Sequence, residues 1–528
     1  MLDLIRFHGR FAMRWLRSTL SFGLLIAPWL TLAAFPARAA SPIADVELDL
    51  AAIHKWDDSN GDTWDPFWAD DDDLYSLNCD GRGFGTQPRN MAFHRLSGDA
   101  VEHLKGSLVN SMDAYGKADQ KAADGATWKA LGQECIDGTF YVFVSRHTYG
   151  HESHDRLMRQ TAVNASLIKS TDRGRTWSRS EPENYHAPMW PGPRFGAPYF
   201  IHYGRNGGNV AQDAADRYVY ALSNNGFWNG GDDYILARVE RAKLADLRAT
   251  DWTYWSSGDG ADVGNWTAAI DRARPILSLP GQCGSGPACY VPALKVYVLV
   301  AWYIPEKLKK WFEPKELKYD FYQAEHPWGP WTRIRSCSDN FLVGGHMYGP
   351  SLCAKFQEAA GDNVRVALFT SGCPFEDQPS GIYKMWEIPV ILKTVADPPS
   401  VLINDDDPAI AYHGQWKSVH RSGCHYFHDD LHSTTHAGDS LELNFTGTGI
   451  EYITEKFHDL GNVDIYLDGA LAANVNLAGM NFPRISQVVA YRAKDLPSGR
   501  HTIRIVSKSR AYAIVDAFRI YGGKPEKR

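Results

Sequence analysis

Asn60 to Gly85 reads NGDTWDPFWADDDDLYSLNCDGRGFG and places seven aspartates, two tryptophans and four glycines in 26 residues. A plain core strand or a solvated linker would not have this composition. The residues predict a solvated turn at Asp70 to Asp73, a short strand at Leu74 to Cys79 and a glycine-rich exit at Gly81 to Gly85. The stretch is therefore expected to fold as a hairpin with acids at both ends.

The acids of this hairpin have two interpretations. Carboxylates on the two strands of a tight hairpin can act in acid/base catalysis on a sugar, and they can also bind calcium. Aspartate is common in turns for purely structural reasons, and this interpretation is favoured for Asp71 to Asp73. Asp65 and Asp80 flank the turn and are the candidates for chemistry.

The whole chain has 528 residues, of which 44% are hydrophobic and 22% are charged, so it is long enough for two globular domains. Its formal net charge of −7 favours neither a nucleic-acid nor an anionic-membrane partner. The 18 Trp, 25 Tyr and 23 Phe suit sugar-stacking surfaces and β-rich cores equally well.

The first 40 residues have the pattern of an export signal. Four arginines precede the apolar run Phe22 to Phe35, and Ala37-Arg38-Ala39 offers a small-residue cleavage site. A cleaved signal is predicted, with a secreted or periplasmic location and no membrane association after its removal; an uncleaved anchor is the alternative. Eight cysteines in an exported chain suggest disulfides, and Cys283 with Cys289 is the best candidate pair.

Residues 41 to 394 contain short β-like runs between Gly, Pro, Asn and Asp clusters, with almost no helical periodicity. Ser170 to Trp177 reads STDRGRTW and fits the Asp-box pattern of propeller hairpins. Looser turns of similar shape lie at Gly98, Trp252 and Gly329, so the successive intervals are 76, 78 and 77 residues. Such spacing is typical of radial repetition of four-stranded blades and predicts a β-propeller, most simply with five blades.

A second β-rich region follows a boundary at residues 395 to 402, where Asp397-Pro398-Pro399 breaks the strand pattern. Residues 403 to 528 alternate cleanly between apolar and polar positions and predict an antiparallel β-sandwich. Phe445-Thr-Gly-Thr-Gly-Ile450 and Val463-Asp-Ile-Tyr-Leu-Asp-Gly469 resemble the galactose-binding-like jelly-roll modules of secreted glycan-degrading enzymes. This resemblance implies attachment to carbohydrate or a neutral spacer.

Motifs in the first region carry a second resemblance. Cys79-Asp80-Gly81, Asp137-Gly-Thr-Phe-Tyr141, Phe195-Gly-Ala-Pro198 and Tyr348-Gly-Pro-Ser351 are similar to a propeller family catalogued as a domain of unknown function. That family resembles five-bladed glycoside hydrolases and includes endo-D-arabinanases. The resemblance implies a polysaccharide or oligosaccharide substrate.

In a propeller, residues distant in sequence converge at the axial mouth. Asp65 and Asp80 are the predicted catalytic pair, with Asp62 or Asp70 as substitutes for Asp65, and Gly81 leaves room for a ligand. No cofactor is expected, although calcium in the acidic hairpin stays open. The candidate substrate-binding residues are Trp64, Trp68, Arg82, Arg146, His147, Arg194, Tyr203, His346 and Tyr348.

Three functions remain open from the sequence. The first is a glycoside hydrolase with paired carboxylates. The second is a polysaccharide lyase with His147 or His151 as base, Tyr203 or Tyr348 as acid, and Arg146 or Arg194 opposite a uronate. The third is a non-catalytic glycan-binding surface protein.

Overall fold

A computed structural model describes residues 42–150, 158–178, 186–208, 217–257, 266–308, 310, 313–378 and 381–526. The predicted signal lies outside the described residues, as does His151, one of the two candidate bases of a lyase. Among the described residues, no helix is long and apolar enough to span a membrane. The chain divides into Met1–Ala40 and a compact unit from Ser41 to Arg528, which is almost entirely β-structure.

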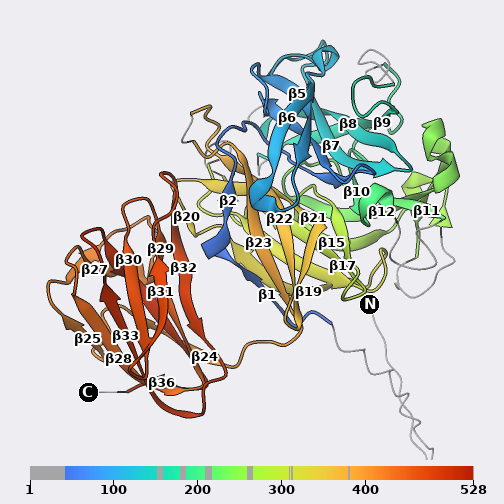
Figure 1. Cartoon of the computed structure of the whole chain (residues 1–528). Helices are drawn as coiled ribbons and strands as arrows, with labels where there is room; N and C mark the ends of the chain where they lie inside the picture. Colours follow the sequence, from blue (N-terminus) through green and yellow to red (C-terminus); the bar gives the residue numbers. More distant parts are fainter. Residues whose placement is uncertain are drawn as a thin grey trace, which may run out of the picture. The chain divides into compact units, whose positions relative to one another are not determined.

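Residues up to Lys393 form the five blades of a β-propeller (Figure 1), so the predicted fold and blade number are confirmed. Blade 1 contains β3 (Phe67–Trp68), β4 (Leu74–Gly81), β5 (Arg89–Ser97) and β6 (Lys105–Asn110); blade 2 contains β7 (Thr127–Ile136), β8 (Thr139–Thr148) and β9 (Thr161–Ser170). Blade 3 contains β10 (Ala197–His202), β11 (Tyr218–Asn224), β12 (Gly231–Glu240), β13 (Trp252–Trp255) and β14 (Trp266–Thr267), and β15 (Pro275–Cys283) pairs with β12. Blade 4 contains β16 (Ala288–Val291), β17 (Val296–Tyr303), β18 (Lys318–Ala324) and β19 (Thr332–Ser338).

The fifth blade joins the two ends of the propeller. It contains β21 (His346–Ala360), β22 (Asn363–Cys373) and β23 (Met385–Lys393), and β1 (Asp45–Leu48) completes it as the outer strand. β1 runs antiparallel to β23, with Asp45 opposite Lys393, and β2 (His54–Lys55) also pairs with β23. The first strand of the described chain therefore closes the ring onto the last blade.

The acidic hairpin forms the inner half of blade 1. β3 and β4 are antiparallel, and Asp70 to Asp73 make the turn between them. As the turn interpretation predicts, these acids pair with arginines of the propeller. Asp70 forms a bidentate contact with Arg173, and Asp73 forms an ion pair with Arg95.

Residues 400 to 525 form the predicted β-sandwich. One sheet has the order β20 (Leu342–Val343), β32 (Arg484–Ala493), β29 (Gly449–Lys456), β35 (Ala517–Tyr521) and β24 (Ser400–Asn404). The second contains β25 (Ile410–His413), β28 (Ser440–Gly447), β33 (Gly499–Ser507), β30 (Asn462–Leu467), β31 (Ala470–Asn476) and β36 (Lys524–Pro525). A small third sheet contains β26 (Lys417–His420), β27 (Asp430–Thr434) and β34 (Ala513–Val515).

Two details differ from expectation. β24 begins at Ser400, within the stretch expected to be a linker, because Ser400 to Asn404 pair with β35. The suggested Cys283 to Cys289 disulfide is wrong, since all eight cysteines are free thiols. Cys283 and Cys289 are buried in different apolar clusters.

The described helices are short 3₁₀ turns in connections. They are η1 (Leu50–Ala52), η2 (Val101–His103), η3 (Asp113–Tyr115), η5 (Arg205–Gly207), η6 (Arg241–Asp246), η7 (Ala249–Asp251), η8 (Ile270–Arg272) and η9 (Phe427–Asp429).

Candidate active site

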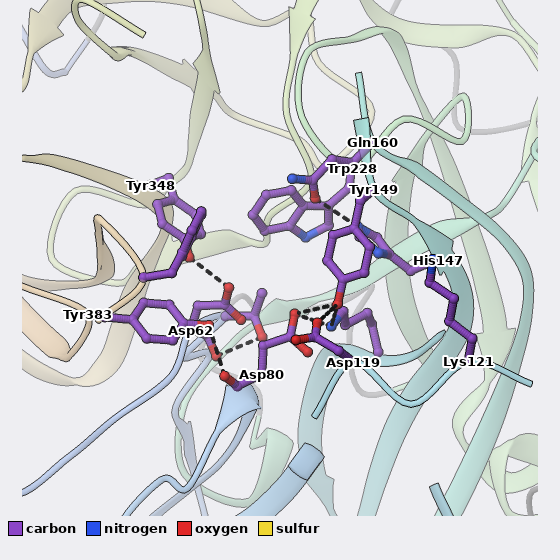
Figure 2. A pocket seen from close by; sticks show the side chains of 13 residues that line it. Asp62, Asp80, Asp119, Lys121, His147, Tyr149, Gln160, Trp228, Tyr348 and Tyr383 are labelled. Carbon is purple, nitrogen blue, oxygen red and sulfur yellow. Dashed lines mark hydrogen bonds and ion pairs between the residues drawn. The ribbon is translucent and has the colours of Figure 1, made fainter. Parts of the chain in front are cut away.

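A cavity of about 480 Å³ collects side chains from four propeller blades, and we call it the mouth cavity (Figure 2). Blade 1 supplies two carboxylates, blades 1 and 2 and their connection supply most of the polar groups, and blades 3 and 5 supply aromatic rings. The lining residues are Asp62, Thr63, Asp80, Asp119, Lys121, Lys129, His147, Tyr149, Gln160, Trp228, Tyr348, Phe375 and Tyr383. Convergence of this kind is expected where the blades of a propeller meet.

Asp62 and Asp80 are brought together by a short antiparallel bridge. Asp62 and Cys79 exchange two backbone hydrogen bonds of 2.9 and 2.8 Å. Asp80, the next residue of β4, has a positive φ of 50°, in the left-handed region that aspartate tolerates better than most residues. The two carboxylates are thus held by backbone pairing at the start and end of the hairpin.

The Asp62 carboxyl has neutral polar partners. It is 7% exposed, and Tyr348 Oη donates a hydrogen bond of 2.7 Å to its Oδ2. Burial, together with the nearby charge of Asp80, raises the pKa of Asp62 to about 7 against the opposing effect of Lys129. Its Oδ1 is buried without a hydrogen-bond partner among the described residues.

The Asp80 carboxyl has a cationic partner. Lys129 Nζ contacts Asp80 Oδ2. Tyr149 Oη lies 3.1 Å from the same oxygen and 2.8 Å from Asp119 Oδ1, so Asp80 and Asp119 share one hydroxyl proton. Burial raises the pKa of Asp80, and Lys129 opposes that effect. Burial would lower the pKa of Lys129, but Asp80, Tyr149, Cys79 and Asp62 together outweigh burial and raise that pKa, so the ammonium stays charged. Of the two carboxyls, Asp80 is therefore the one whose charged form a neighbouring ammonium stabilises.

The rest of the cavity is aromatic and hydrogen-bonding. Figure 2 shows Asp62 and Asp80 between Tyr348 and Tyr383 on one side and Tyr149 on the other. His147 shares a hydrogen bond of 2.8 Å with Gln160, and burial lowers the pKa of its imidazole to about 3. The His147 ring is therefore neutral at physiological pH.

A second cluster of charged groups is buried among the inner strands, and we call Asp65, Glu134, His202 and Ser351 the axial cluster. His202 lies between the two acids, with 2.9 Å from Nε2 to Asp65 Oδ1 and 2.8 Å from Nδ1 to Glu134 Oε2. Ser351 Oγ donates to Asp65 Oδ1 over 2.7 Å. Burial opposes a charge on His202, but the two acids raise its pKa to about 10. The axial cluster joins innermost segments of blades 1, 2, 3 and 5 through a buried imidazolium.

The structure places only some of the predicted site residues in the mouth cavity. Asp80, His147 and Tyr348 line it, as does Asp62, the named substitute for Asp65. Asp65 is 2% exposed and belongs to the axial cluster. Glu134 of β7 lies there too.

The other predicted substrate contacts lie outside this cavity. Trp64 is fully buried, and Trp68 donates a hydrogen bond to Asp72. Arg82 donates to the backbone carbonyls of Asp58 and Gly85, and Arg194 donates to the Ala273 carbonyl. The remaining three have these partners: Arg146 with Asp124, His346 with Asp339, and Tyr203 with the rings of Tyr290 and Tyr297.

Sequence reasoning missed Lys129, Tyr149, Trp228 and Tyr383. A signal was present for Lys129, because a lysine within the otherwise uncharged run Thr127 to Gln133 needs a partner when the strand is buried. The aromatic residues gave no signal, since similar rings fill the core throughout the chain. Among the described residues, no group of three or more His, Cys, Asp or Glu side chains is arranged to hold a metal ion.

Comparisons with known proteins give limited similarity, and no family model matches the chain. The A type blood N-acetyl-alpha-D-galactosamine deacetylase of Flavonifractor plautii is 33% identical over 112 residues, which is 21% of this chain and 14% of that protein. The A type blood alpha-D-galactosamine galactosaminidase of the same organism is 32% identical over 100 residues, or 19% of this chain and 9% of that protein. The chain thus spans less than one sixth of the length of these curated relatives.

Among solved structures, an exo-beta-1,3-galactanase from Phanerochaete chrysosporium aligns over 90% of this chain and all of its own, with 11% identity and a TM-score of 0.39. A putative hydrolase from Bacteroides ovatus aligns over 67% of this chain and 93% of its own, with 12% identity and a TM-score of 0.41. The roles of individual residues therefore rest on the geometry of the mouth cavity.

Proposed function

We propose that the chain is a secreted carbohydrate-active enzyme that hydrolyses glycosidic bonds in the mouth cavity. The observation that carries the proposal is the contrast between its two carboxyls. Asp62 has a hydroxyl partner and a pKa of about 7, whereas Asp80 has an ammonium partner. Two carboxyls whose surroundings separate their protonation states are what a glycosidase requires.

The roles follow from those surroundings. Asp62, which keeps its proton up to about pH 7, donates that proton to the leaving glycosidic oxygen. Asp80, whose charged form the Lys129 ammonium stabilises, acts either as the nucleophile at the anomeric carbon or as the base that takes a proton from the water that attacks this carbon. Trp228, Tyr348 and Tyr383 offer ring faces and hydroxyls to a sugar.

The lyase alternative has less support. Burial lowers the pKa of its proposed base His147 to about 3, so this imidazole, which is paired with Gln160, is a weak proton acceptor. Its other acid, Tyr203, and both arginines lie outside the mouth cavity. His151 is not among the described residues. The binding-protein alternative is less favoured because the cavity contains three carboxyls: Asp62, Asp80 and Asp119.

The test is hydrolysis of plant, algal and mycobacterial polysaccharides and of glycans that contain galactosamine, the sugar named in both curated relatives. Asp80→Asn and Asp62→Asn should each lower kcat by at least about 100-fold, the range of acid/base contributions. Asparagine also tolerates the positive φ of Asp80.

Asp72→Asn is the matched control, because Asp72 also has a positive φ and lies in the exposed turn outside the mouth cavity. Full activity of Asp80→Asn on a substrate that the native enzyme cleaves would refute the assignment. An ultraviolet-absorbing unsaturated product would instead identify a lyase.

A further inference from the structure

The β-sandwich contains a pocket of about 360 Å³ that the mouth cavity does not account for, and we call it the sandwich pocket. Its floor is one face of the small sheet β26, β27 and β34. Lys417, Ser433 and Ile514 form one row across the three strands, and Val419 and Leu431 form the next row. All five residues line the pocket, so the period-two alternation of the strands presents this whole face to it.

The walls add groups that suit a sugar. The Tyr512 ring is 44% exposed, one of the few exposed large hydrophobic side chains of the described chain. Tyr512 N donates to the Asp459 carbonyl over 3.1 Å, which fixes the two residues side by side. Asp459 Oδ1 is buried and has no hydrogen-bond partner among the described residues. An aromatic face beside an unused carboxylate oxygen fits a ring that carries hydroxyls.

The charge of the sandwich pocket is predominantly positive. Lys417, Arg421 and Arg484 line it against the single acid Asp459. Arg484 is already paired with the buried Glu455. Lys417 is exposed, and its ammonium forms no ion pair with any described residue. A cation with no protein partner, on the floor of a concave site, is available to a ligand anion.

We propose that the sandwich pocket binds an acidic saccharide, a sugar unit that carries a carboxylate or a sulfate. Lys417 contacts the anion, Tyr512 stacks on the ring, and Asp459 accepts a hydrogen bond from a hydroxyl. The choice of a saccharide rests on the proposed action on glycans, whereas the requirement for an anion rests on the sandwich pocket alone.

The binding experiment uses the full chain with Asp80→Asn, so that the probe is not consumed and the result does not depend on catalysis. Three probes are titrated by calorimetry at low and high salt: an oligogalacturonide, a sulfated galactan oligosaccharide and a neutral galactan oligosaccharide. The proposal expects tighter binding of at least one acidic probe than of the neutral one, with affinity that falls as salt increases. Comparison of the two acidic probes distinguishes a carboxylate from a sulfate.

Lys417→Gln should weaken the acidic probe about tenfold, the usual effect of losing a hydrogen bond to a charged group, and leave the neutral probe unchanged. Tyr512→Ala should weaken acidic and neutral probes alike. Lys524→Gln is the control, because Lys524 is an exposed lysine of the same β-sandwich outside the pocket. Equal affinity for acidic and neutral probes, or Lys417→Gln behaving like Lys524→Gln, would overturn the proposal. Neither outcome would bear on hydrolysis in the mouth cavity.

Discussion

At the scale of single residues, Asp62 and Asp65 are three positions apart in the sequence but lie in different surroundings. Asp62 lies in the mouth cavity, whereas Asp65 is buried in the axial cluster beside His202. Thr63, between them, has a positive φ of 56°, which interrupts the alternation of an extended strand. Because of this break, counting odd and even positions along the sequence cannot tell which acid points into the mouth cavity.

The pKa of Asp62 predicts the pH at which activity declines on the alkaline side of the pH-rate profile. Since its pKa of about 7 makes it the acid, kcat/KM should fall above about pH 7 as the proton is lost. Tyr348 donates to Asp62 and favours the charged form, so Tyr348→Phe should move this limb to higher pH. A pH-rate profile measures the shift. Tyr290→Phe, outside the mouth cavity, should leave the limb in place, and an unmoved limb in Tyr348→Phe would argue against Asp62 as the acid.

The buried imidazolium predicts a pH-dependent stability. The folded pKa of His202, about 10, exceeds its ordinary value of 6.5, so its contribution is complete below pH 6.5 and is lost as the pH rises through about 10. His202→Gln leaves two buried acids without their cation and should lower the free energy of unfolding by about 3 to 5 kcal/mol near pH 6.5. Urea titrations should show this difference shrinking toward pH 10.

His94→Gln is the control for that measurement. Burial lowers the pKa of His94 to about 3, so this histidine is neutral in the folded state throughout the range from pH 6.5 to 10. Its effect on stability should be flat across that window. A flat difference for His202→Gln as well would contradict a charged His202.

At the scale of elements, the sequence correctly predicted the turns and strands that depend on neighbouring residues. The turn at Asp70 to Asp73 and the strand after it depend on nearby residues, and the structure confirms them. The repeated turns predicted five blades because each blade repeats one local pattern of strands. The mouth cavity was harder to predict, since Lys129, Trp228 and Tyr383 reach it from three other blades and nothing local marks their convergence.

The role of β1 was not predicted from the sequence. It completes blade 5, and Val46 is 1% exposed against the propeller core. Val46→Ala should lower the free energy of unfolding by about 2 kcal/mol through lost burial and a residual cavity. Val401→Ala, at a strand position that is 44% exposed, should change it by less than about 0.5 kcal/mol. Chemical denaturation compares the two, and equal losses would show that β1 does not close the ring.

At the scale of the whole molecule, contacts join the propeller and the β-sandwich within the compact unit that runs from Ser41 to Arg528. β20 follows blade 4 in the chain but pairs with β32 of the sandwich. Arg492 Nε lies 2.6 Å from Glu451 of the sandwich, and its Nη2 lies 2.5 Å from Glu47 of β1. Lys456 donates to the Ala51 carbonyl over 3.0 Å. The Arg492 contact attaches the sandwich to β1, which closes the propeller, and the Lys456 bond attaches it to η1, which follows β1.

This arrangement predicts that the propeller and the sandwich unfold together. Differential scanning calorimetry of the native chain should give one transition, since loss of the sandwich removes partners of β1. Arg492→Met combined with Lys456→Met removes two of the side-chain links, and each partly exposed link contributes up to about 1 kcal/mol. The Lys55 bond to the Phe482 carbonyl, the Ser486 bond to the Phe341 carbonyl and the β20 to β32 pairing remain, so the double variant should broaden the transition without dividing it into two.

Arg500→Met, which removes an ion pair with Glu526 inside the sandwich, should leave the transition as sharp as in the native chain because it touches no propeller residue. Two transitions already present in the native chain would mean that the side-chain links and the β20 to β32 pairing are too weak to couple the parts. The sandwich would then be free to bind an acidic saccharide independently of the mouth cavity.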